Sequence, residues 1–394
     1  MNRVLSAGLW LWLWLWSWLP AGQAGASPPG PAGASAGCSY FHDEVRSGPW
    51  SVHIVKVARA QAGLAWHTTL GKNGMFGMAT LSEQLRVWPA ELGRPVAAVN
   101  GDFYERIQGY EGRPRDLQIH RGELVTDPAG HAVFWIAADG QPRLTNIVSR
   151  FRIEWADGTS TPFGLNTTRP DNAVVLYTAR LGPSTHTAGG TELTLEAAGE
   201  GPWLPLQAGR TYVARVREVR STGNTPLSQD ILVLSVGPRM TSRLPAVQRG
   251  TALRIVTETS PDLTGVTTSI GGGPTLVRGW KPRQWNGVQL RHPRTAIGWN
   301  HDYLFLVEVD GRQSDLSVGM TFAELADYLA RLGCEHAMNL DGGGSATLWF
   351  EGKVKNRPSE GRERACPNAL VVVDASAVRV AAGDASLGLP VVAA

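Results

Sequence analysis

One short segment places a carboxylate beside a very open stretch of backbone. Residues 338–348 read MNLDGGGSATL, so Asp341 closes a predicted strand, three glycines follow, and Ser345 begins the next strand. Glycine lacks a Cβ and tolerates positive φ, so a triple-glycine loop lets the backbone approach a bound molecule closely. The pattern predicts a ligand-binding turn, although a glycine-rich hairpin would share it. The glycines of this loop are Gly342, Gly343 and Gly344.

Two further loops have a similar character. Residues 271–273 are a second triple glycine, and two such loops in one chain are hard to explain by turns alone. Residues 100–102, Asn-Gly-Asp, follow an apolar strand, which places their polar groups at a sheet edge. Asp102 is therefore a second candidate carboxylate, although an Asp in such a turn can also simply bond backbone N–H groups. The candidate substrate contacts in these loops are Asn100, Gly101, Gly271, Gly272 and Gly273.

Several arginines and polar residues accompany these loops. Arg294 and Thr295 begin a predicted strand, Arg312 follows another, and Asn166 and Arg169 share a polar stretch. The planar guanidinium donates two parallel hydrogen bonds and keeps its charge when buried, which suits phosphate recognition. Together the arginines favour an anionic substrate, while each alone could be an ordinary surface residue.

Strands must position most of these groups. Apolar runs rich in Val, Ile, Leu and Tyr lie between Gly, Pro, Asn and Asp breaks, which is typical of strands. Short turns between several of them favour antiparallel pairing. The clearest predicted strands are 95–99, 173–178, 211–219, 231–236, 253–257, 303–309, 346–350 and 370–373.

Two helices are signalled by their first residues. Thr321 with Glu324, and Thr80 with Glu83, have the spacing of a capping box. After Thr321 an apolar stripe continues until Gly333, which is expected to end the helix. The predicted fold class is α+β, with large, mostly antiparallel sheets and a few packed helices.

Composition excludes several classes of protein. Hydrophobic residues make up 43% and charged residues 18% of the 394-residue chain, as expected of a folded domain. The net charge is +3 without a dense basic run, so no nucleic-acid partner is expected. Cys38, Cys334 and Cys366 include no C-x-x-C pair, so no metal or redox site is predicted from them. A Cys334–Cys366 disulfide is possible in an exported protein.

The N-terminus resembles a secretory signal. Arg3 precedes an apolar stretch over 7–19, and a small-residue triplet, Ala-Gly-Ala, occupies 24–26. The apolar stretch is shorter than the roughly 20 residues that span a bilayer. We expect a signal peptide at 1–26, no membrane span after its removal, and a secreted, periplasmic or cell-envelope location. A Pro/Gly/Ala-rich disordered linker is expected at 27–37 and a tail at 377–394.

The motifs, in order, resemble the phosphodiester glycosidase family. The resemblance runs over the stretches VNGDFY (99–104), NTTRPDNAVVLYT (166–178), GGGP (271–274), RTAIGW (294–299), DGR (310–312), TFAELADYLARLG (321–333), MNLDGGGSATL (338–348), NRPS (356–359) and NALVVV (368–373). It implies a catalytic domain at 38–376 that removes a GlcNAc-like sugar from a sugar-1-phosphodiester of a glycan or cell-envelope polymer. It also implies that Asp102 and Asp341 belong to the site, with Arg294, Asn339 and Ser345 near them.

These expectations define a mechanism and two rivals. Arg294, helped by Arg169, is expected to hold the phosphate, while Asp102 and Asp341 divide the roles of base or nucleophile and sugar-orienting group. No cofactor is expected, and a divalent cation is left open. The alternatives are a non-catalytic exopolysaccharide-binding or export module, and a metal-dependent phosphodiesterase that uses the same carboxylates.

Overall fold

The computed structural model describes residues 34–35, 37–199, 201–376 and 378. The predicted signal peptide, most of the predicted linker and nearly all of the predicted tail lie outside the described residues. Pairing begins inside the predicted linker, where β1 (Ala34–Ser35) lies antiparallel to β2 (Cys38–Val45). Within the described part of the chain, every helix is too short or too polar to cross a bilayer.

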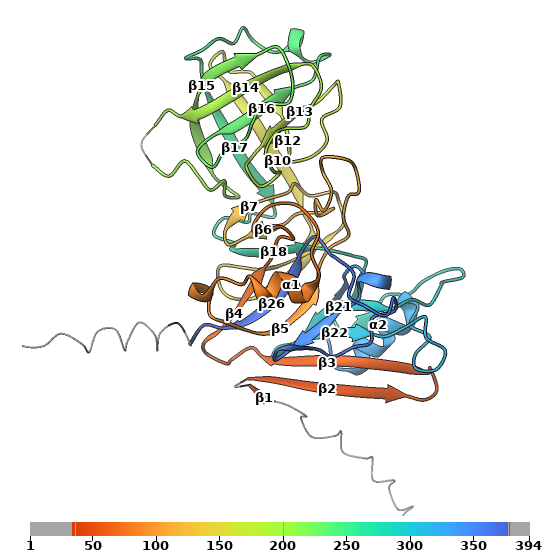
Figure 1. The fold of residues 1–394 in the computed structure, drawn as a ribbon. Helices are drawn as coiled ribbons and strands as arrows, with labels where there is room; N and C mark the ends of the chain where they lie inside the picture. The colour runs from red at the N-terminus through yellow and green to blue at the C-terminus, as the bar shows by residue number, and fades with distance from the viewer. Residues whose placement is uncertain (1–33, 36, 200, 377, 379–394) are drawn as a thin grey trace, which may run out of the picture. The chain divides into compact units, whose positions relative to one another are not determined.

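Four sheets account for most of the described structure (Figure 1). Sheet A has the order β1, β2, β3 (Trp50–Ala58), β22 (Tyr303–Val309), β21 (Arg294–Trp299), β23 (His336–Asn339), β19 (Thr275–Arg278) and β20 (Lys281–Pro282). Sheet B has the order β11 (Ser160–Pro162), β10 (Val148–Trp155), β17 (Ala252–Ser260), β15 (Thr211–Arg220), β14 (Thr191–Ala197), β16 (Leu232–Val236), β13 (Val174–Tyr177) and β12 (Gly164–Leu165).

The two remaining sheets have five strands each. Sheet C has the order β7 (Glu123–Leu124), β6 (Ile119–His120), β18 (Thr268–Gly271), β8 (Ala132–Ile136) and β9 (Pro142–Asn146). Sheet D has the order β25 (Lys353–Val354), β24 (Leu348–Phe350), β5 (Arg94–Asn100), β26 (Ala369–Asp374) and β4 (Leu64–Thr68). All eight predicted strands are present, with ends shifted by a few residues. Antiparallel pairing prevails as expected, and β12 with β13 is the parallel pair among the described strands.

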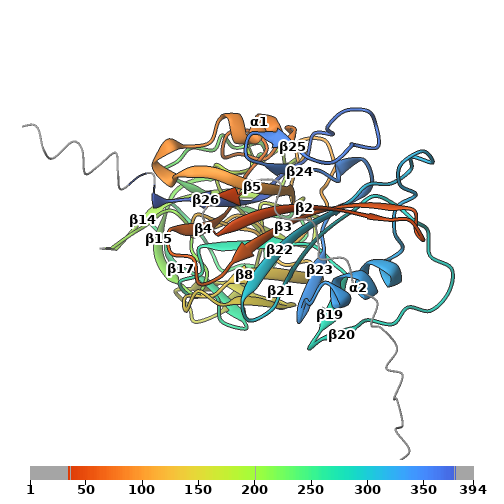
Figure 2. The same ribbon diagram turned by 90° about the horizontal axis from the view of Figure 1, so that it is seen from below.

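Only two α-helices occur in the described residues, so the protein is mostly β and the expected α+β class holds only loosely. They are α1 (Leu81–Arg86) and α2 (Phe322–Arg331), and both begin with the predicted capping box. Three 3₁₀ turns accompany them: η1 (Ala90–Leu92), η2 (Thr241–Arg243) and η3 (Gly343–Ser345). Figure 2 shows α1 beside sheet D and α2 beside β19 and β20.

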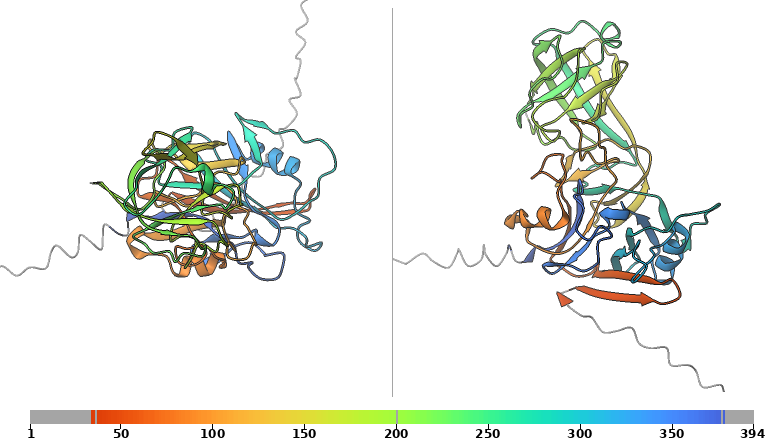
Figure 3. Two further views of the ribbon diagram at one scale, coloured as in Figure 1. Left: turned by 90° about the horizontal axis from the view of Figure 1, so that it is seen from above. Right: turned by 45° about the vertical axis from the view of Figure 1, so that its right-hand side comes forward.

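Sheets A, C and D share one hydrophobic core. Val55 and Leu306 of sheet A pack with Val99 and Phe350 of sheet D, and Phe134 adds a side chain from sheet C. Strands from opposite ends of the chain meet here, because β3 pairs with β22 and β5 pairs with β26; Figure 3 shows red and orange ribbons beside pale and dark blue ones. Sheet B encloses a separate core that includes Phe151, Leu193 and Leu234.

The prediction of a possible Cys334–Cys366 disulfide is wrong. All three cysteines are unpaired and buried. Cys334 lies in the core under α2, whereas the Cys366 thiol lies 3.9 Å from the carbonyl oxygen of Ser345. Burial raises the pKa of each thiol to about 12, so none is poised to react.

Candidate active site

Three loops from three sheets meet at one place. They follow β5, β18 and β23, which end at Asn100, Gly271 and Asn339. The Asp341 N–H donates to the Gly101 carbonyl at 2.9 Å, and the Gly273 N–H donates to the Asn339 carbonyl at 2.7 Å. The three loops singled out in the sequence are thus joined by main-chain hydrogen bonds.

The side chains of Asn100 and Thr295 stabilise the junction of the three loops. The Asn100 amide donates to the Asp341 carbonyl at 2.7 Å, and its oxygen accepts from the Thr295 hydroxyl at 2.7 Å and the Thr347 N–H at 3.0 Å. Asn100 and Thr295 are both buried. Their geometry fits positioning residues rather than substrate contacts.

The glycines allow close approach between loops as well as an open backbone. A Cβ on Gly271 would lie 2.5 Å from Oδ2 of Asp102, and one on Gly272 would lie 2.6 Å from the Asn339 carbonyl. Gly343 has a φ of +63°, which L side chains rarely adopt. The second triple glycine is therefore required partly because a buried carboxylate packs against it.

Asp102 is almost completely enclosed. Its Oδ1 accepts from the Phe103 N–H at 2.8 Å, its Oδ2 accepts from the Asp116 N–H at 2.7 Å, and it is 1% exposed. Burial raises the pKa of Asp102 to about 7, although the backbone donors oppose this shift. The Asp102 N–H donates to the side chain of Asn368, which begins the stretch NALVVV but was not among the predicted site residues.

Asp341 is less enclosed than Asp102. Its Oδ1 accepts from the Gly342 N–H at 2.9 Å. Burial raises the pKa of Asp341, and the nearby Ser345 hydroxyl is the strongest influence that opposes this shift. The Asn339 Oδ1 is buried and has no hydrogen-bond partner among the described residues, whereas the Ser345 hydroxyl lies close enough to Asp341 to stabilise its charged form. An unpaired polar atom of this kind leaves the Asp341 loop able to bond a ligand.

Arg115 is a cation near the two aspartates that the sequence did not predict. Its guanidinium lies 4.2 Å from the centre of the Phe103 ring and donates to the Gly272 carbonyl at 3.3 Å, while its buried Nε has no partner among the described residues. The Arg115 charge opposes the raised pKa of both Asp102 and Asp341. A single arginine outside any glycine loop gave no signal in the sequence.

Two other arginines border the Asp341 loop. The predicted Arg312 lies along Gly343, where an added Cβ would be 3.1 Å from its guanidinium, and it contacts His292 Nδ1 at 3.2 Å. Arg364, which was not predicted, forms an ion pair with Glu360. The charge of Arg364 opposes the rise in the pKa of Asp341. Arg312 thus brings a positive charge suited to an anion beside the loop, whereas the charge of Arg364 is balanced by Glu360.

Arg294 is not brought to the carboxylates. Successive side chains of a strand point to opposite faces, and Thr295 of β21 takes the face toward Asn100. Arg294 instead donates to the carbonyls of Met320 and Leu290 and stacks 3.9 Å from the centre of the Phe322 ring. Burial, and then the charge of Arg312, lower the pKa of Arg294 to about 10.

Asn166 and Arg169 also lie elsewhere, with sheet B. The Asn166 side chain bonds the Val125 carbonyl and both the hydroxyl and N–H of Thr178, at 2.8–2.9 Å. Arg169 donates to the carbonyls of Ala188 and Gly189. Their spacing from the glycine loops along the chain did not reveal that they would fold into another sheet.

A cavity of about 420 Å³ adjoins the junction. His131 lines it and bonds through Nδ1, at 3.1 Å, to the buried Asp116, which also donates its N–H to Asp102. The cavity therefore joins aromatic and cationic side chains to the Asp102 network. Its lining includes Phe103, Arg115, His131, Gly273, Arg283 and Phe322.

Neither candidate aspartate belongs to a metal-binding cluster in the described residues. The one group of three acidic or histidine ligands found there consists of His53, Glu308 and Asp310. The arrangement of Asp102 and Asp341 instead fits proton transfer or attack at a carbon next to an anion.

Comparisons with solved structures support the fold. A protein from Synechocystis superposes with a TM-score of 0.67 at 20% identity, covering 85% of this chain and 62% of its own. A Burkholderia pseudomallei protein designated as exported gives 0.62 at 22% identity, covering 83% of this chain and 74% of its own.

Sequence comparisons identify relatives over shorter stretches. The prophage-derived protein YomE of Bacillus subtilis is 39% identical over 114 residues, which are 27% of this chain and 18% of YomE. The N-acetylglucosamine-1-phosphodiester alpha-N-acetylglucosaminidase of Bos taurus is 38% identical over 76 residues, 18% of this chain and 14% of the bovine enzyme. The chain thus spans less than a fifth of either relative. Residues 208–373 match the phosphodiester glycosidase family model, which confirms the expected resemblance to that family.

Proposed function

We propose that this protein is an exported hydrolase that cleaves the glycosidic bond of a sugar-1-phosphodiester. The observation that carries the proposal is the pairing of two carboxylates with raised pKa, Asp102 and Asp341, with the unpaired donor of Arg115. Perturbed carboxylates beside a free cation are typical of catalytic sites. The family match over 208–373 supports the same reaction class.

The surroundings of the two aspartates suggest different roles. Both oxygens of Asp102 are occupied by backbone donors, so it fits a residue that tunes the site and links it to Asp116. Asp341 is less enclosed and lies beside the Ser345 hydroxyl and the unpaired Oδ1 of Asn339. We assign Asp341 as the carboxylate that attacks C1 or activates water, and Asp102 as its buried partner.

Arg115 replaces Arg294 in the proposed handling of phosphate. The buried Arg115 Nε donates no hydrogen bond to the described residues. Arg312 and Arg364 lie beside the glycines of the Asp341 loop. A phosphodiester leaves as a stable anion, so cations can stabilise departure where an ordinary glycoside needs a strong acid. The cavity of about 420 Å³ would receive the group beyond the phosphate.

The identity of the sugar is proposed from the name of the bovine relative. That enzyme is named for N-acetylglucosamine-1-phosphodiester, and a GlcNAc-like sugar on a glycan or cell-envelope polymer is our proposed substrate. Export is proposed from the signal-like residues 1–26.

Hydrolysis in ¹⁸O-labelled water tests the proposal. Cleavage at C1 places the label in the released sugar, whereas a phosphodiesterase would place it in the phosphate. Purified protein incubated with a panel of sugar-1-phosphodiesters is expected to release labelled free sugar. Label in sugar phosphate would favour the phosphodiesterase alternative, and saturable binding without release would favour the binding module.

A further inference from the structure

A second buried polar cluster lies in sheet A, apart from the candidate active site. His53 on β3 stands directly opposite Glu308 on β22, and Asp310 follows two positions later, so all three side chains share one face. They are 5%, 0% and 1% exposed. One ligand atom from each lies within 4.8 Å of the other two.

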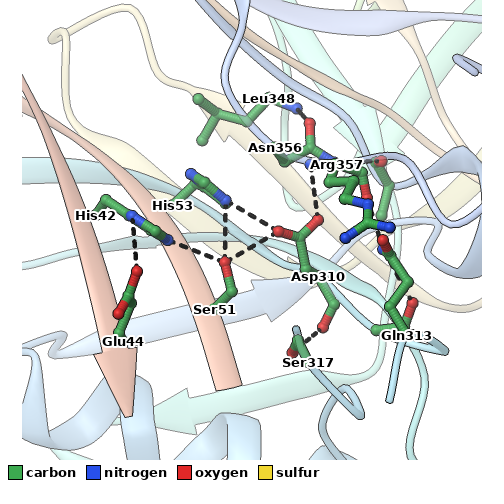
Figure 4. Close-up of polar contacts among 12 residues, drawn as sticks. His42, Glu44, Ser51, His53, Asp310, Gln313, Ser317, Leu348, Asn356 and Arg357 are labelled. Carbon is green, nitrogen blue, oxygen red and sulfur yellow. Dashed lines mark hydrogen bonds and ion pairs between the residues drawn. The ribbon is translucent and has the colours of Figure 1, made fainter. Parts of the chain in front are cut away.

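Most of this cluster is hydrogen-bonded, as Figure 4 shows. Asp310 Oδ2 lies 3.0 Å from His53 Nε2 and accepts from the Ser51 hydroxyl at 3.0 Å, while Oδ1 accepts from the Arg357 N–H at 2.9 Å. His53 Nδ1 is held by the Tyr40 hydroxyl at 2.7 Å.

Glu308 is the exception. Both of its oxygens are fully buried, and neither accepts a hydrogen bond of normal geometry among the described residues, although the Asn356 amide lies nearby. Its neighbours in the cluster are another carboxylate and one imidazole, and no Lys or Arg of the described residues forms an ion pair with it. Removing two carboxylates from water side by side costs several kcal/mol per ion unless positive charge compensates. A small cation between them would provide that charge.

We propose that His53, Glu308 and Asp310 bind one divalent transition-metal ion, with Zn²⁺ as the best match. Imidazole nitrogens and carboxylate oxygens both bind Zn²⁺, and three protein ligands are enough to hold the ion when a water completes the site. Ligand atoms bound at about 2.0–2.2 Å lie at most about 4.4 Å apart, so modest side-chain rotations close the observed set. Tyr40, bonded to the other imidazole nitrogen, would orient His53 as outer ligands of metal sites do.

The ion would have a structural role. It would tie β3 to β22 and, through Asp310, to the loop at Arg357. Glu308 is also the register partner of Thr295, whose hydroxyl bonds Asn100 beneath the candidate site. Metal removal is therefore expected to weaken the fold first and any activity second, and the inference does not depend on the proposed function.

Metal content and stability test this site directly. The purified full chain is stripped with EDTA, dialysed against Zn²⁺, and measured for bound zinc and for Tm with and without the ion. The variants Glu308→Gln and His53→Ala are compared with His301→Ala, because His301 lies 2.7 Å from Asp302 at the surface and controls for exposed His–Asp binding.

One zinc ion per chain is expected, with a Tm raised by Zn²⁺ in the parent and in His301→Ala. Glu308→Gln is expected to bind at least about 10-fold more weakly, as observed generally when metal-site groups are altered. If a variant fails to fold, the Zn²⁺-dependent Tm of the parent still decides. No bound zinc and no Tm change in the parent, or equal binding by Glu308→Gln, would overturn the proposal.

Discussion

The two eight-stranded sheets each bury a glutamate completely and treat it in opposite ways. In sheet B, Glu192 accepts from the hydroxyls of Thr185 and Thr187 at 3.2 and 2.7 Å and from the Thr225 N–H at 2.9 Å. Burial opposes its ionisation, yet these donors lower its pKa. In sheet A, the Asn356 amide is the one side chain that stabilises the charged form of Glu308 among the described residues, and burial followed by Asp310 raises the pKa of Glu308 well above the usual range.

The same contrast separates the wider regions. Where sheets A, C and D meet, the pKa of Asp102 and of Asp341 is raised, because burial outweighs the donors that surround them. In sheet B, by contrast, the hydrogen-bond donors around Glu192 stabilise its charged form. Buried carboxylates with a raised pKa thus occur both at the proposed active site and at the proposed metal site.

The strongest test of this contrast is Asp341→Asn. Sugar release from a sugar-1-phosphodiester is expected to fall by about 1000-fold, as for loss of a catalytic base or nucleophile. Circular dichroism and Tm should change little, because the Gly342 N–H still has an oxygen to bond. Turnover within a few-fold of the parent would remove Asp341 from the mechanism.

The second prediction compares the kinetic effects of Arg115→Met, near the two aspartates, and Arg169→Met, in sheet B. Loss of Arg115 is expected to lower kcat/KM by about 100-fold, or about 2.7 kcal/mol, because a phosphate contact is lost. Arg169 bonds carbonyls in sheet B, so its loss should leave steady-state kinetics unchanged. The reverse ranking would restore the role that the sequence predicted for Arg169.

The pH dependence of stability sharpens the comparison further. The folded protein favours protonated Asp102, whose pKa rises from 3.8 to about 7. Its stabilising contribution is complete below pH 3.8 and is lost as the pH rises through about 7, at about 1.4 kcal/mol per pH unit between the two pKa values. Urea unfolding should show this fall, and Asp102→Asn should flatten it. An identical pH profile for both proteins would contradict the raised pKa.

The smallest expected effect compares the two glutamates themselves. Glu192→Gln should lower the free energy of unfolding by about 2 kcal/mol, because an amide cannot accept from all its donors. In EDTA-treated protein at pH 7, Glu308→Gln should be neutral or stabilising, since burial and Asp310 already favour the uncharged form of Glu308. Urea unfolding measures both, and equal losses would abolish the contrast between the sheets.

Local patterns in the sequence determined a large part of this protein. Both capping boxes, all eight predicted strands and the three loops around Asp102, Gly272 and Asp341 were readable, because each depends on neighbours a few residues apart. The order of the motifs also identified the family that residues 208–373 match.

Tertiary structure decided how distant residues combine. It directs Thr295 to the junction and Arg294 away from it, because strand pairing fixes which face is buried. It recruits Arg115, leaves Cys334 and Cys366 apart, and brings His53 beside Asp310 although 257 positions separate them. Such contacts depend on register and packing between remote strands, which no local spacing encodes.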